Sequence, residues 1–570
     1  MGVDEAVDKA IEKYALDNAA KYDGKANPGA VIGHIIKELP DVKSDMKALA
    51  MKVNAKIKEI NKLGAAAQKK LLEEKYPEML EKKEKEEKDI FAFLGIKPGD
   101  KVKTAFPPGP EKYPHIGHGK ALLLNYLLAK KYNGKFVLRF EDTNPELVKK
   151  EFYDIMMDNF KWLGAEWDEL QYASDNMDLF YSMAEKVIMS GNAYMCTCSQ
   201  EDIKEKRLKG FGCKCRDKKP EQNLDEWKDF PKAGAGKAVL RLKIDMKHEN
   251  STMRDPVIFR IIDAPHARLG TKYRVWPNYD FQNAIMDGYY NITHRLRSKE
   301  FEMRSELQGY IQDLIGITNT VTYEFARFNL EGVPSSGRII REKIANNELI
   351  GWDDPSLTTI VALRRRGFLP EAIREFLVGT GITKSESTMT WDDMIVHNRR
   401  MLDQRAERYF FIAEPQKITI GDAPGQEIEL DLHPDNKHGG RKLRTKDEFY
   451  LAKADFVLVN KGKKADLFRL MDCLNFSKQG KEFVFKSLDY KDYKDKGKRI
   501  MHFLPLQQGL VSVEVMMPDK NIIKGLGEPL MAKLKQGDVI QAERFGFMRL
   551  DRIEKGSDGK DKLVFWFTHQ

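Results

Sequence analysis

The sequence predicts a multi-domain protein of mixed α/β and β architecture, with a helical segment before a parallel α/β core and β-rich segments after it. Three observations support this prediction. At 570 residues the chain is too long for a single core, because domains average about 150 residues. Hydrophobic residues make up 42% of it, which is enough to build several cores. The spacing of its apolar residues also changes twice, near residues 96 and 411.

The composition excludes several classes of protein. No apolar run reaches the roughly 18 residues of a transmembrane helix, and the acidic start at 1–6 lacks the apolar core of a signal peptide. Five cysteines are too few for a disulfide scaffold. The net charge of +9 favours a polyanionic partner only if the basic groups gather on one face. We therefore expect a soluble, cytoplasmic protein without membrane contact.

Residues 1–95 are expected to be helical. Apolar residues recur at helical spacing over 6–15 and again over 31–36. Asn27-Pro28 is a helix-start signal, and Gly24 interrupts the chain just before it. These features predict a helical N-terminal extension.

A strand–helix–strand pattern comes next. Residues 102–106 and 136–140 are expected to form strands, and 117–132 the helix between them. A unit of this kind pairs its two strands in parallel. Open parallel sheets bind ligands at the carboxyl ends of their strands. The loop that precedes residue 118 is therefore the expected place for chemistry.

Beyond residue 411, apolar and polar residues alternate between Gly and Asp turns, which predicts short strands in antiparallel barrels or sandwiches. Aromatic and basic residues mix at 544–549 and 565–567, and most of these aromatics are expected to fill a barrel core. The basic run at 363–366 is expected on a solvated helix face. The alternating segments are 416–421, 427–432, 455–460 and 511–515.

The motif His115-Ile-Gly-His118 stands where the first strand meets its helix. Two imidazoles three residues apart lie on one side of the turn, and backbone N–H groups at a helix start favour anions. Gly117 leaves room for a ligand to approach. The arrangement suits a triphosphate whose α-phosphate is attacked, with both histidines donating hydrogen bonds. A metal-binding pair is the alternative, but the preceding strand and Pro/Gly loop favour a nucleotide.

The His-Ile-Gly-His motif resembles that of the class I aminoacyl-tRNA synthetases. Further segments look like the glutamyl/glutaminyl branch of that family. The helical N-terminal extension and a β-rich C-terminal region resemble the archaeal-type glutamyl-tRNA synthetases. The segments that carry the resemblance are 24–28, 139–145, 279–284, 291–297, 351–355 and 362–367.

The resemblance implies a domain order and a reaction. Glutamate would react with ATP, accompanied by Mg²⁺, to give glutamyl adenylate and pyrophosphate, and the glutamyl group would then pass to tRNA(Glu). A Rossmann-like catalytic domain would be interrupted by an acceptor-stem insertion and followed by a stem-contact region and anticodon-binding β-barrels. The implied boundaries are a helical extension at 1–95, catalytic halves at 96–195 and 276–335, the insertion at 196–275, the helical stem-contact region at 336–410 and the barrels at 411–570.

The resemblance also assigns residues to the substrates. His115 and His118 are implied as catalytic residues that contact the phosphates. The remaining implied ATP-binding residues are Gly117, Ser335, Ser336 and Arg338.

Arg297 is implied to lie beside the side chain of the amino acid. An arginine fork pairs with a carboxylate through charge-assisted hydrogen bonds, whereas an amide offers a single acceptor oxygen. Glutaminyl enzymes resemble this segment but carry a small neutral residue there, so Arg297 favours glutamate. Glu141 is implied to hold the amino group, and Tyr279 to close the pocket.

The cysteines form two close pairs. Cys196-x-Cys198 and Cys213-x-Cys215 are separated by fourteen residues, and four thiolates in two pairs suit a tetrahedral structural zinc ion. The C-x-C spacing is tighter than the usual C-x₂-C, and reduced free thiols are the alternative. Archaeal-type relatives have a similar arrangement in the acceptor-stem insertion. Cys473 is expected to be a small core residue.

Three segments depart from the family pattern. Ala105 stands where the family has an arginine that helps to hold the substrate carboxylate, and 108–112 differs from the usual Pro-x-Pro-Ser-Gly. The segment 333–338, where a Lys-Met-Ser-Lys-Ser-type loop would fall, keeps two serines but not the lysine. Arg295 is the candidate that would offset Ala105. Arg338, Arg341 and Lys343 are the candidates for the missing cation.

These departures keep other functions open. A catalytically impaired relative that still binds tRNA is one alternative, and a glutaminyl-tRNA synthetase is another. A nucleotidyltransferase without a tRNA substrate is a third, because small enzymes of that kind use a similar His-x-x-His turn. Whether tRNA(Gln) is charged as well depends on anticodon contacts that the sequence does not locate.

Overall fold

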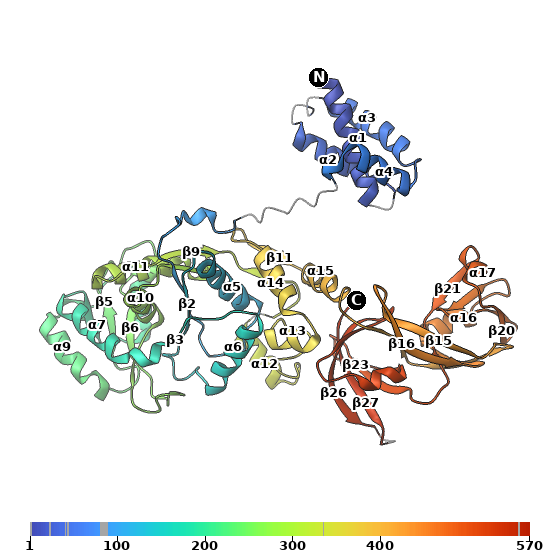
Figure 1. Cartoon of the computed structure of the whole chain (residues 1–570). Coiled ribbons are helices and arrows are strands. Elements are labelled where there is room, and N and C mark those ends of the chain that lie inside the picture. The colour runs from blue at the N-terminus through green and yellow to red at the C-terminus, as the bar shows by residue number, and fades with distance from the viewer. Residues whose placement is uncertain are drawn as a thin grey trace. The chain divides into compact units, whose positions relative to one another are not determined.

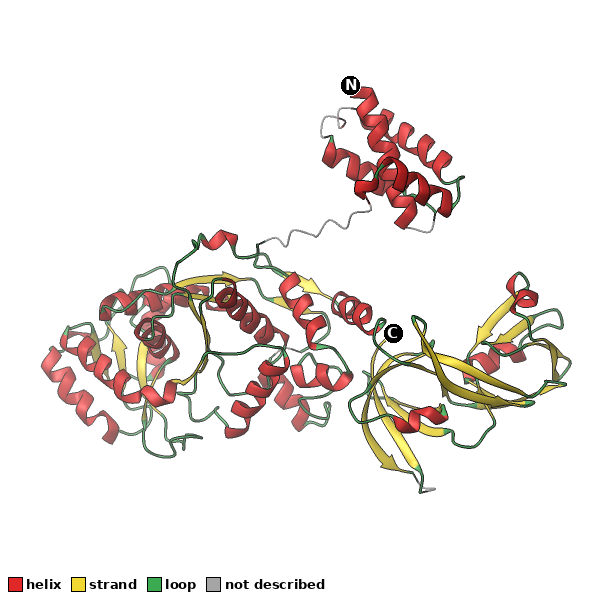
Figure 2. Ribbon diagram, viewed as in Figure 1, coloured by secondary structure: helices red, strands yellow, loops and turns green. Residues whose placement is uncertain are grey.

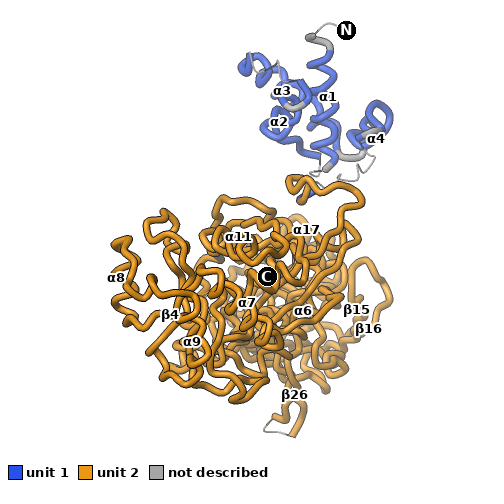
Figure 3. The backbone as a smooth tube through the Cα atoms, turned by 90° about the vertical axis from the view of Figure 1, so that its left-hand side faces the viewer, with its two compact units in different colours: residues 1–90 blue, residues 91–570 orange. Residues whose placement is uncertain are grey.

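The computed structural model describes residues 3–21, 24–39, 42, 45–79, 89–334, 336–556 and 559–570. The chain divides into two compact units, residues 1–90 and residues 91–570, which Figure 3 draws in blue and orange. Within the described ranges, no helix has both the length and the apolarity needed to cross a membrane.

The first unit is a small helical bundle. Asn27 caps its second helix by accepting hydrogen bonds from the backbone N–H groups of Gly29 and Ala30, and Pro28 takes the first helical position, where no N–H is needed. Apolar side chains such as Ile11 and Val31 fill its core. The expected helical extension is therefore confirmed. Its helices are α1 (Val3–Lys21), α2 (Pro28–Glu38), α3 (Met46–Ile60) and α4 (Ala65–Lys75) (Figure 1).

The second unit begins with a parallel sheet, as expected. Its strands run in the order β3–β2–β1–β8–β9, and each neighbouring pair is parallel. The chain builds outward from β1 to β3 on one side and then returns to place β8 on the other side of β1. The carboxyl ends of β1 and β8 therefore meet at a topological switch point, where open sheets bind ligands. The strands are β1 (Lys103–Phe106), β2 (Lys135–Phe140), β3 (Glu169–Tyr172), β8 (His294–Ser298) and β9 (Val321–Phe325).

Helices flank this sheet, and a second sheet lies between its two halves in the sequence (Figure 2). The flanking helices are α5 (Ile116–Lys131), α6 (Lys150–Trp162), α7 (Met177–Met189), α10 (Tyr279–Tyr289) and α11 (Glu302–Ile315). The second sheet is antiparallel and contains β4 (Ala193–Cys196), β5 (Val239–Leu242), β6 (Val257–Ile261) and β7 (Val275–Pro277), with α8 (Gln200–Lys209) and α9 (Pro220–Asp229).

A mostly helical region connects this part to the C-terminal strands. It contains β10 (Phe328–Leu330), α12 (Gly337–Ala345), α13 (Ile360–Arg366), α14 (Pro370–Gly379), β11 (Ser387–Met389) and α15 (Trp391–Leu402).

The basic run at 363–366 is only in part the solvated helix face that was expected, because Arg364 is exposed, Arg365 is half-buried and Arg366 is buried. The side chain of Arg366 is 3% exposed and donates hydrogen bonds to the backbone oxygens of Pro355 (2.9 Å), Thr568 (2.7 Å) and Phe567 (3.3 Å). Local sequence cannot reveal this role, because two of the three carbonyl partners lie about two hundred residues away along the chain.

The C-terminal strands form two mostly antiparallel, barrel-like sheets. In one of them the edge strands β12 and β13 are separated in the chain by Phe410 alone, so the two edges are brought together. This sheet runs β12 (Arg408–Tyr409), β25 (Val539–Ala542), β26 (Gly546–Lys555), β27 (Asp561–His569), β23 (Val511–Met516), β24 (Ile522–Gly527) and β13 (Phe411–Ala413). Phe565 and Phe567 are buried in the core of this sheet, as expected, whereas Phe547 is buried in a separate small cluster with Leu402 and Ala406.

The other sheet packs around a separate apolar core that includes Cys473, as expected for that residue. Its order is β21 (Gly497–Met501), β18 (Leu467–Leu470), β19 (Asn475–Gln479), β20 (Glu482–Ser487), β14 (Gln416–Gly421), β17 (Glu448–Leu451) and β22 (Leu504–Pro505). A hairpin of β15 (Gln426–His433) and β16 (Asn436–Thr445) and a short helix α17 (Tyr490–Lys494) accompany it.

One expected strand is wrong. Residues 455–460 belong to the helix α16 (Lys453–Asn460). Asp455 and Val459, four residues apart, are buried on one helix face, and the Asp455 carboxylate pairs with Arg544 at 3.2 Å. Residues four apart share a face in a helix and also in a strand, so this spacing does not by itself distinguish the two structures. Alternation over six residues is too short to exclude this outcome.

Candidate active site and metal centre

A cavity of about 700 Å³ opens at the switch point of the parallel sheet. It is lined by the loop after β1, the first turn of α5, the ends of β2 and β8, and the start of α10. The cavity brings together residues that the sequence analysis named from five separate segments. Those that line it are His115, Gly117, His118, Glu141, Tyr279, Arg297 and Ser336.

The two imidazoles are oriented by the backbone of their own turn. His115 is the N-cap of α5, and its Nδ1 accepts a hydrogen bond from the Gly117 N–H at 3.0 Å. The Nδ1 atom of His118 accepts from the His115 N–H at 3.2 Å. Because both Nδ1 atoms act as acceptors, the proton of each neutral ring resides on Nε2. Each ring therefore keeps an Nε2–H donor that its own turn does not use.

Gly117 is needed for this geometry. A Cβ at position 117 would lie 2.8 Å from Cε1 of the His115 ring. Any side chain there would displace the imidazole that caps the helix.

Both imidazoles are neutral at physiological pH. Burial lowers the pKa of His115 to about 3, and the nearby charges of Lys112 and Arg327 lower it further in the same direction. Burial, followed by the adjacent His115 and by Lys112, lowers the pKa of His118 well below its ordinary value. The histidines can thus donate hydrogen bonds, but they carry no positive charge toward an anionic ligand.

Glu141 lies directly after β2 and is held by a ring of polar groups. The Arg139 Nε pairs with its Oε1 at 2.7 Å, and the side-chain amides of Gln282 and Asn283 on α10 donate to it. Burial raises the pKa of Glu141, and the Arg139 guanidinium opposes that rise. A bound ammonium group would provide this buried carboxylate with a further cation.

Arg297 projects from β8 into the same cavity. Its Nη1 donates to the Gln308 Oε1 at 2.9 Å, and its guanidinium lies 5.7 Å from the centre of the Phe301 ring. Burial and the adjacent charge of Arg295 lower the pKa of Arg297 to about 10. A ligand carboxylate beside Arg297 would relieve this repulsion.

Ala105 and Arg295 are neighbours across two strands. The register pairs Thr104 of β1 with His294 of β8, which places Ala105 beside Arg295 on the same face of the sheet. Arg295 is 2% exposed and lines the cavity, and its Nη1 pairs with Asp287 at 2.5 Å. Arg295 therefore places a guanidinium on the strand beside position 105.

The other candidate cations are not among the residues that line this cavity. Ser335 lies outside the described residues. Arg338 is exposed and does not line the cavity. The Arg341 Nη1 donates a hydrogen bond to the Glu111 backbone oxygen at 3.4 Å. The Lys343 Nζ pairs with Glu348 at 2.8 Å.

Some residues of the cavity were missed by sequence reasoning. Gln282 and Asn283 stand three and four residues after Tyr279, the spacing that places side chains on one helix face, so α10 carried a usable signal. Lys112 and Arg327 also line the cavity. Their approach depends on how loops fold back, for which the sequence holds no periodic signal.

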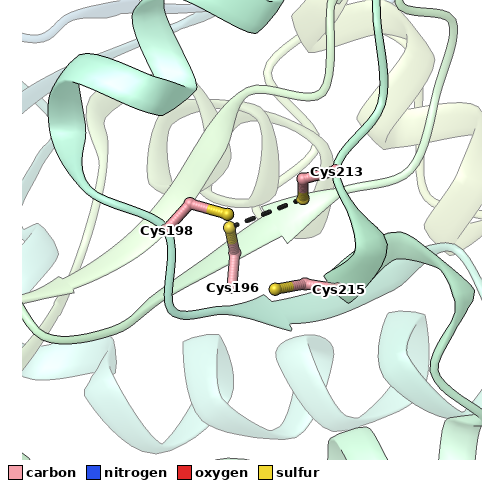
Figure 4. A group of neighbouring side chains, drawn as sticks. All are labelled: Cys196, Cys198, Cys213 and Cys215. Atoms are coloured by element: carbon pink, nitrogen blue, oxygen red, sulfur yellow. Dashed lines mark hydrogen bonds between the residues drawn. The ribbon is translucent and has the colours of Figure 1, made fainter.

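Cys196, Cys198, Cys213 and Cys215 lie close together in the segment with the antiparallel sheet (Figure 4). None of them lines the cavity. Cys196 ends β4, and Cys213 and Cys215 lie at the 3₁₀ turn Lys214–Asp217. All four Sγ atoms lie within 4.8 Å of one another, and those of Cys196 and Cys213 are 3.8 Å apart.

Three parts of the chain match domains of one known family. Residues 101–404 match the catalytic domain of the "tRNA synthetases class I (E and Q)", and residues 406–490 and 484–551 match two anti-codon binding domains of the same description. The chain belongs to the class I (E and Q) tRNA synthetases. The resemblance inferred from the motifs is thereby confirmed, as is the combination of a parallel catalytic sheet with barrel-like C-terminal sheets.

Relatives within the class I (E and Q) synthetases align over their full length. A glutamate–tRNA ligase from Pyrococcus furiosus is 39% identical, with 99% of this chain and all of the relative covered. One from Methanothermobacter thermautotrophicus is 36% identical with the same coverage. A crystal structure of a glutamate tRNA ligase from Elizabethkingia meningosepticum aligns over 54% of this chain and 70% of that chain, at 17% identity and a TM-score of 0.41.

Proposed function

We propose that this chain attaches L-glutamate to tRNA(Glu) in an ATP-dependent reaction, releasing AMP and pyrophosphate. The observation that carries the proposal is the cavity at the switch point, whose lining combines two neutral Nε2–H donors with Glu141 and Arg297. A cytoplasmic location follows from this function.

The first step is the formation of glutamyl adenylate. An oxygen of the glutamate α-carboxylate attacks the α-phosphorus of ATP, the bond from that phosphorus to the bridging oxygen breaks, and pyrophosphate leaves. His115 and His118 donate hydrogen bonds to the phosphate oxygens as charge develops on them. Gly117 and Ser336 line the same part of the cavity, and Mg²⁺ enters with ATP as part of the substrate.

In the second step the 2′ hydroxyl of the terminal ribose of tRNA, the position that class I enzymes use, attacks the glutamyl carbonyl, the bond to the phosphate breaks and AMP leaves. Glu141 holds the amino group of glutamate, Arg297 its side-chain carboxylate, and Tyr279 closes the pocket. Catalysis in both steps consists of positioning and charge stabilisation. The insertion at 196–275 would meet the acceptor stem, and the C-terminal sheets the anticodon arm.

The paired arginines argue for glutamate over glutamine. Arg295 and Arg297 project from one strand, and the positive charge of Arg295 already disfavours that of Arg297. A carboxylate offsets this repulsion, whereas a neutral amide does not. A glutaminyl activity therefore does not fit this pocket.

The four paired cysteines fit a structural Zn²⁺. Tetrahedral zinc with sulfur ligands at about 2.3 Å requires sulfur–sulfur separations near 3.8 Å, which is the Cys196–Cys213 distance. Four thiolates fill the coordination sphere and leave no open position, so the ion would stabilise the fold and take no part in the reaction.

The decisive experiment is glutamylation of purified tRNA(Glu) with labelled glutamate and ATP. Wild-type protein should form glutamyl-tRNA, glutamine should not replace glutamate, and the His118→Ala variant should lose at least about a hundredfold in rate. Charging of tRNA(Gln) in the same assay tests the wider specificity. Absence of any product with wild-type protein would refute the proposal.

A second candidate is a catalytically impaired relative that retains tRNA binding. Ala105 and the lysine-free segment 333–338 favour it. Intact tRNA binding without pyrophosphate exchange in the presence of tRNA would support this candidate. Failure to bind any tRNA would instead favour a nucleotidyltransferase.

A further inference from the structure

The phosphate end of the cavity needs a positive charge that the histidines do not provide. Both imidazoles are neutral, and a triphosphate carries several negative charges. Besides the Mg²⁺ that enters with ATP, a protein cation that touches the phosphates must therefore come from elsewhere in the cavity lining.

Lys112 is the cation whose charge lowers the pKa of both histidines. Its charge acts on His115 and on His118, whereas Arg327 acts on His115 alone among the two. Arg327 is already paired with Glu300 at 3.1 Å. Lys120 is 3% exposed, with its ammonium 5.0 Å from the centre of the Phe325 ring.

The ammonium of Lys112 remains available to a ligand. In the described part of the chain it forms no ion pair and no hydrogen bond, although Lys112 lines the cavity. Burial lowers the pKa of Lys112, so its charge is poorly solvated there. A phosphate oxygen beside the ammonium would favour its charged form.

The side chain of Lys112 also lies against the segment that lacks a lysine. A Cβ at Gly337, the first residue of α12, would be 2.8 Å from Cδ of Lys112. The loop before α5 thus places the Lys112 side chain at the start of α12, where segment 333–338 ends.

We propose that Lys112 binds the β- and γ-phosphates of ATP and stabilises the departing pyrophosphate, so that the loop before His115 takes the role of the absent lysine. The inference rests on the proposed function, because it concerns the same ATP site. Lysine suits this role as a compact point charge. The alternative source is Arg338, whose exposed side chain would have to move into the cavity.

The test compares three variants by calorimetric binding of ATP and of AMP. Lys112→Met should weaken ATP binding roughly tenfold or more and leave AMP binding unchanged, since AMP lacks the β- and γ-phosphates. Lys112→Arg keeps the charge and should stay within roughly threefold of wild type. Lys101→Met, which removes an exposed lysine outside the cavity, should bind both nucleotides as wild type does.

Kinetics then separate positioning of ATP from a general loss of structure. In pyrophosphate exchange with tRNA present, Lys112→Met should lower kcat/KM for ATP while KM for glutamate stays constant. Equal losses for ATP and AMP, or unchanged ATP binding, would overturn the inference. A wild-type protein that binds ATP through Lys112 but forms no glutamyl-tRNA would refute the proposed function and leave the phosphate assignment intact.

Discussion

At the scale of single residues, the His115–His118 turn shows how backbone geometry sets chemistry. The two Nδ1 atoms accept backbone N–H groups, which fixes the tautomer, and burial keeps both rings neutral. Neutral Nε2–H groups serve as hydrogen-bond donors, and the charge for the phosphates is left to a separate residue. The division of labour explains why a cavity with two histidines also needs Lys112.

The lowered histidine pKa values predict how stability depends on pH. Between the ordinary pKa near 6.5 and the folded value of about 3, the unfolded chain binds protons that the folded chain does not, so the free energy of unfolding falls as pH falls. Between pH 7.0 and 5.5 the His115→Asn variant should lose about 1 kcal/mol less than wild type. Urea unfolding at both pH values measures this difference. Equal losses would mean that the folded imidazole takes up a proton.

At the scale of elements, the insertion depends on few apolar contacts around its cysteines. Ile203 is the buried residue of α8, and it packs in a small cluster with Tyr194, Cys196 and Cys213. A cluster of this size provides little hydrophobic stabilisation. A metal ion at the four thiolates would hold α8 and the 3₁₀ turn onto β4 where apolar packing does not.

This arrangement predicts one zinc ion per chain. Elemental analysis should find a stoichiometric ion in wild type and less than about half of it in Cys213→Ser, because three ligands bind structural zinc poorly. Cys473→Ala, in a distant core, should retain the ion and serves as the matched control. A chelator should raise proteolysis between residues 197 and 212 in wild type. Full zinc content in Cys213→Ser would contradict the assignment.

At the scale of the whole second unit, α13 joins the catalytic part to the C-terminal sheet. Arg366 donates to the backbone oxygens of Phe567 and Thr568, and the Arg365 fork pairs with Asp551 at 2.8 Å through both of its arms. Gly367, at φ +97°, has no room for a side chain, because a Cβ would lie 2.8 Å from Thr568 Oγ1. The end of α13 is thereby tied to β27, the last strand of the chain.

The contacts between α13 and β27 predict that substitutions of two neighbouring arginines have unequal effects on the free energy of unfolding. Arg366→Met leaves buried carbonyl oxygens without a donor and should cost roughly 2 to 4 kcal/mol of stability. Arg364→Met, which breaks an exposed pair with Asp158, should cost under about 1 kcal/mol. Thermal unfolding of both variants checks the contrast. Similar melting temperatures would show that the joint is weak.

Much of the fold could be predicted because many of its helices and strands are determined by residues that are neighbours in the sequence. The crossover strands, α5, the helical extension and most C-terminal strands follow from periodicity and turn residues, and the first histidine turn follows from its position after a strand. The strand expected at 455–460 is the exception. It became α16 because Asp455 is buried beside Arg544, a partner that no local window contains.

The sequence by itself was enough to predict the family, the His115–His118 turn, the two cysteine pairs and the role of Arg297 in favouring glutamate. Each of these features is a short motif whose residues lie close together in the chain. The tertiary structure alone decided which distant residues meet. The return of β8 beside β1 sets Arg295 next to Ala105, and the fold of two loops sets Lys112 against Gly337. The physical reason is that charge compensation depends on distance in space, whereas periodicity records only neighbours along the chain.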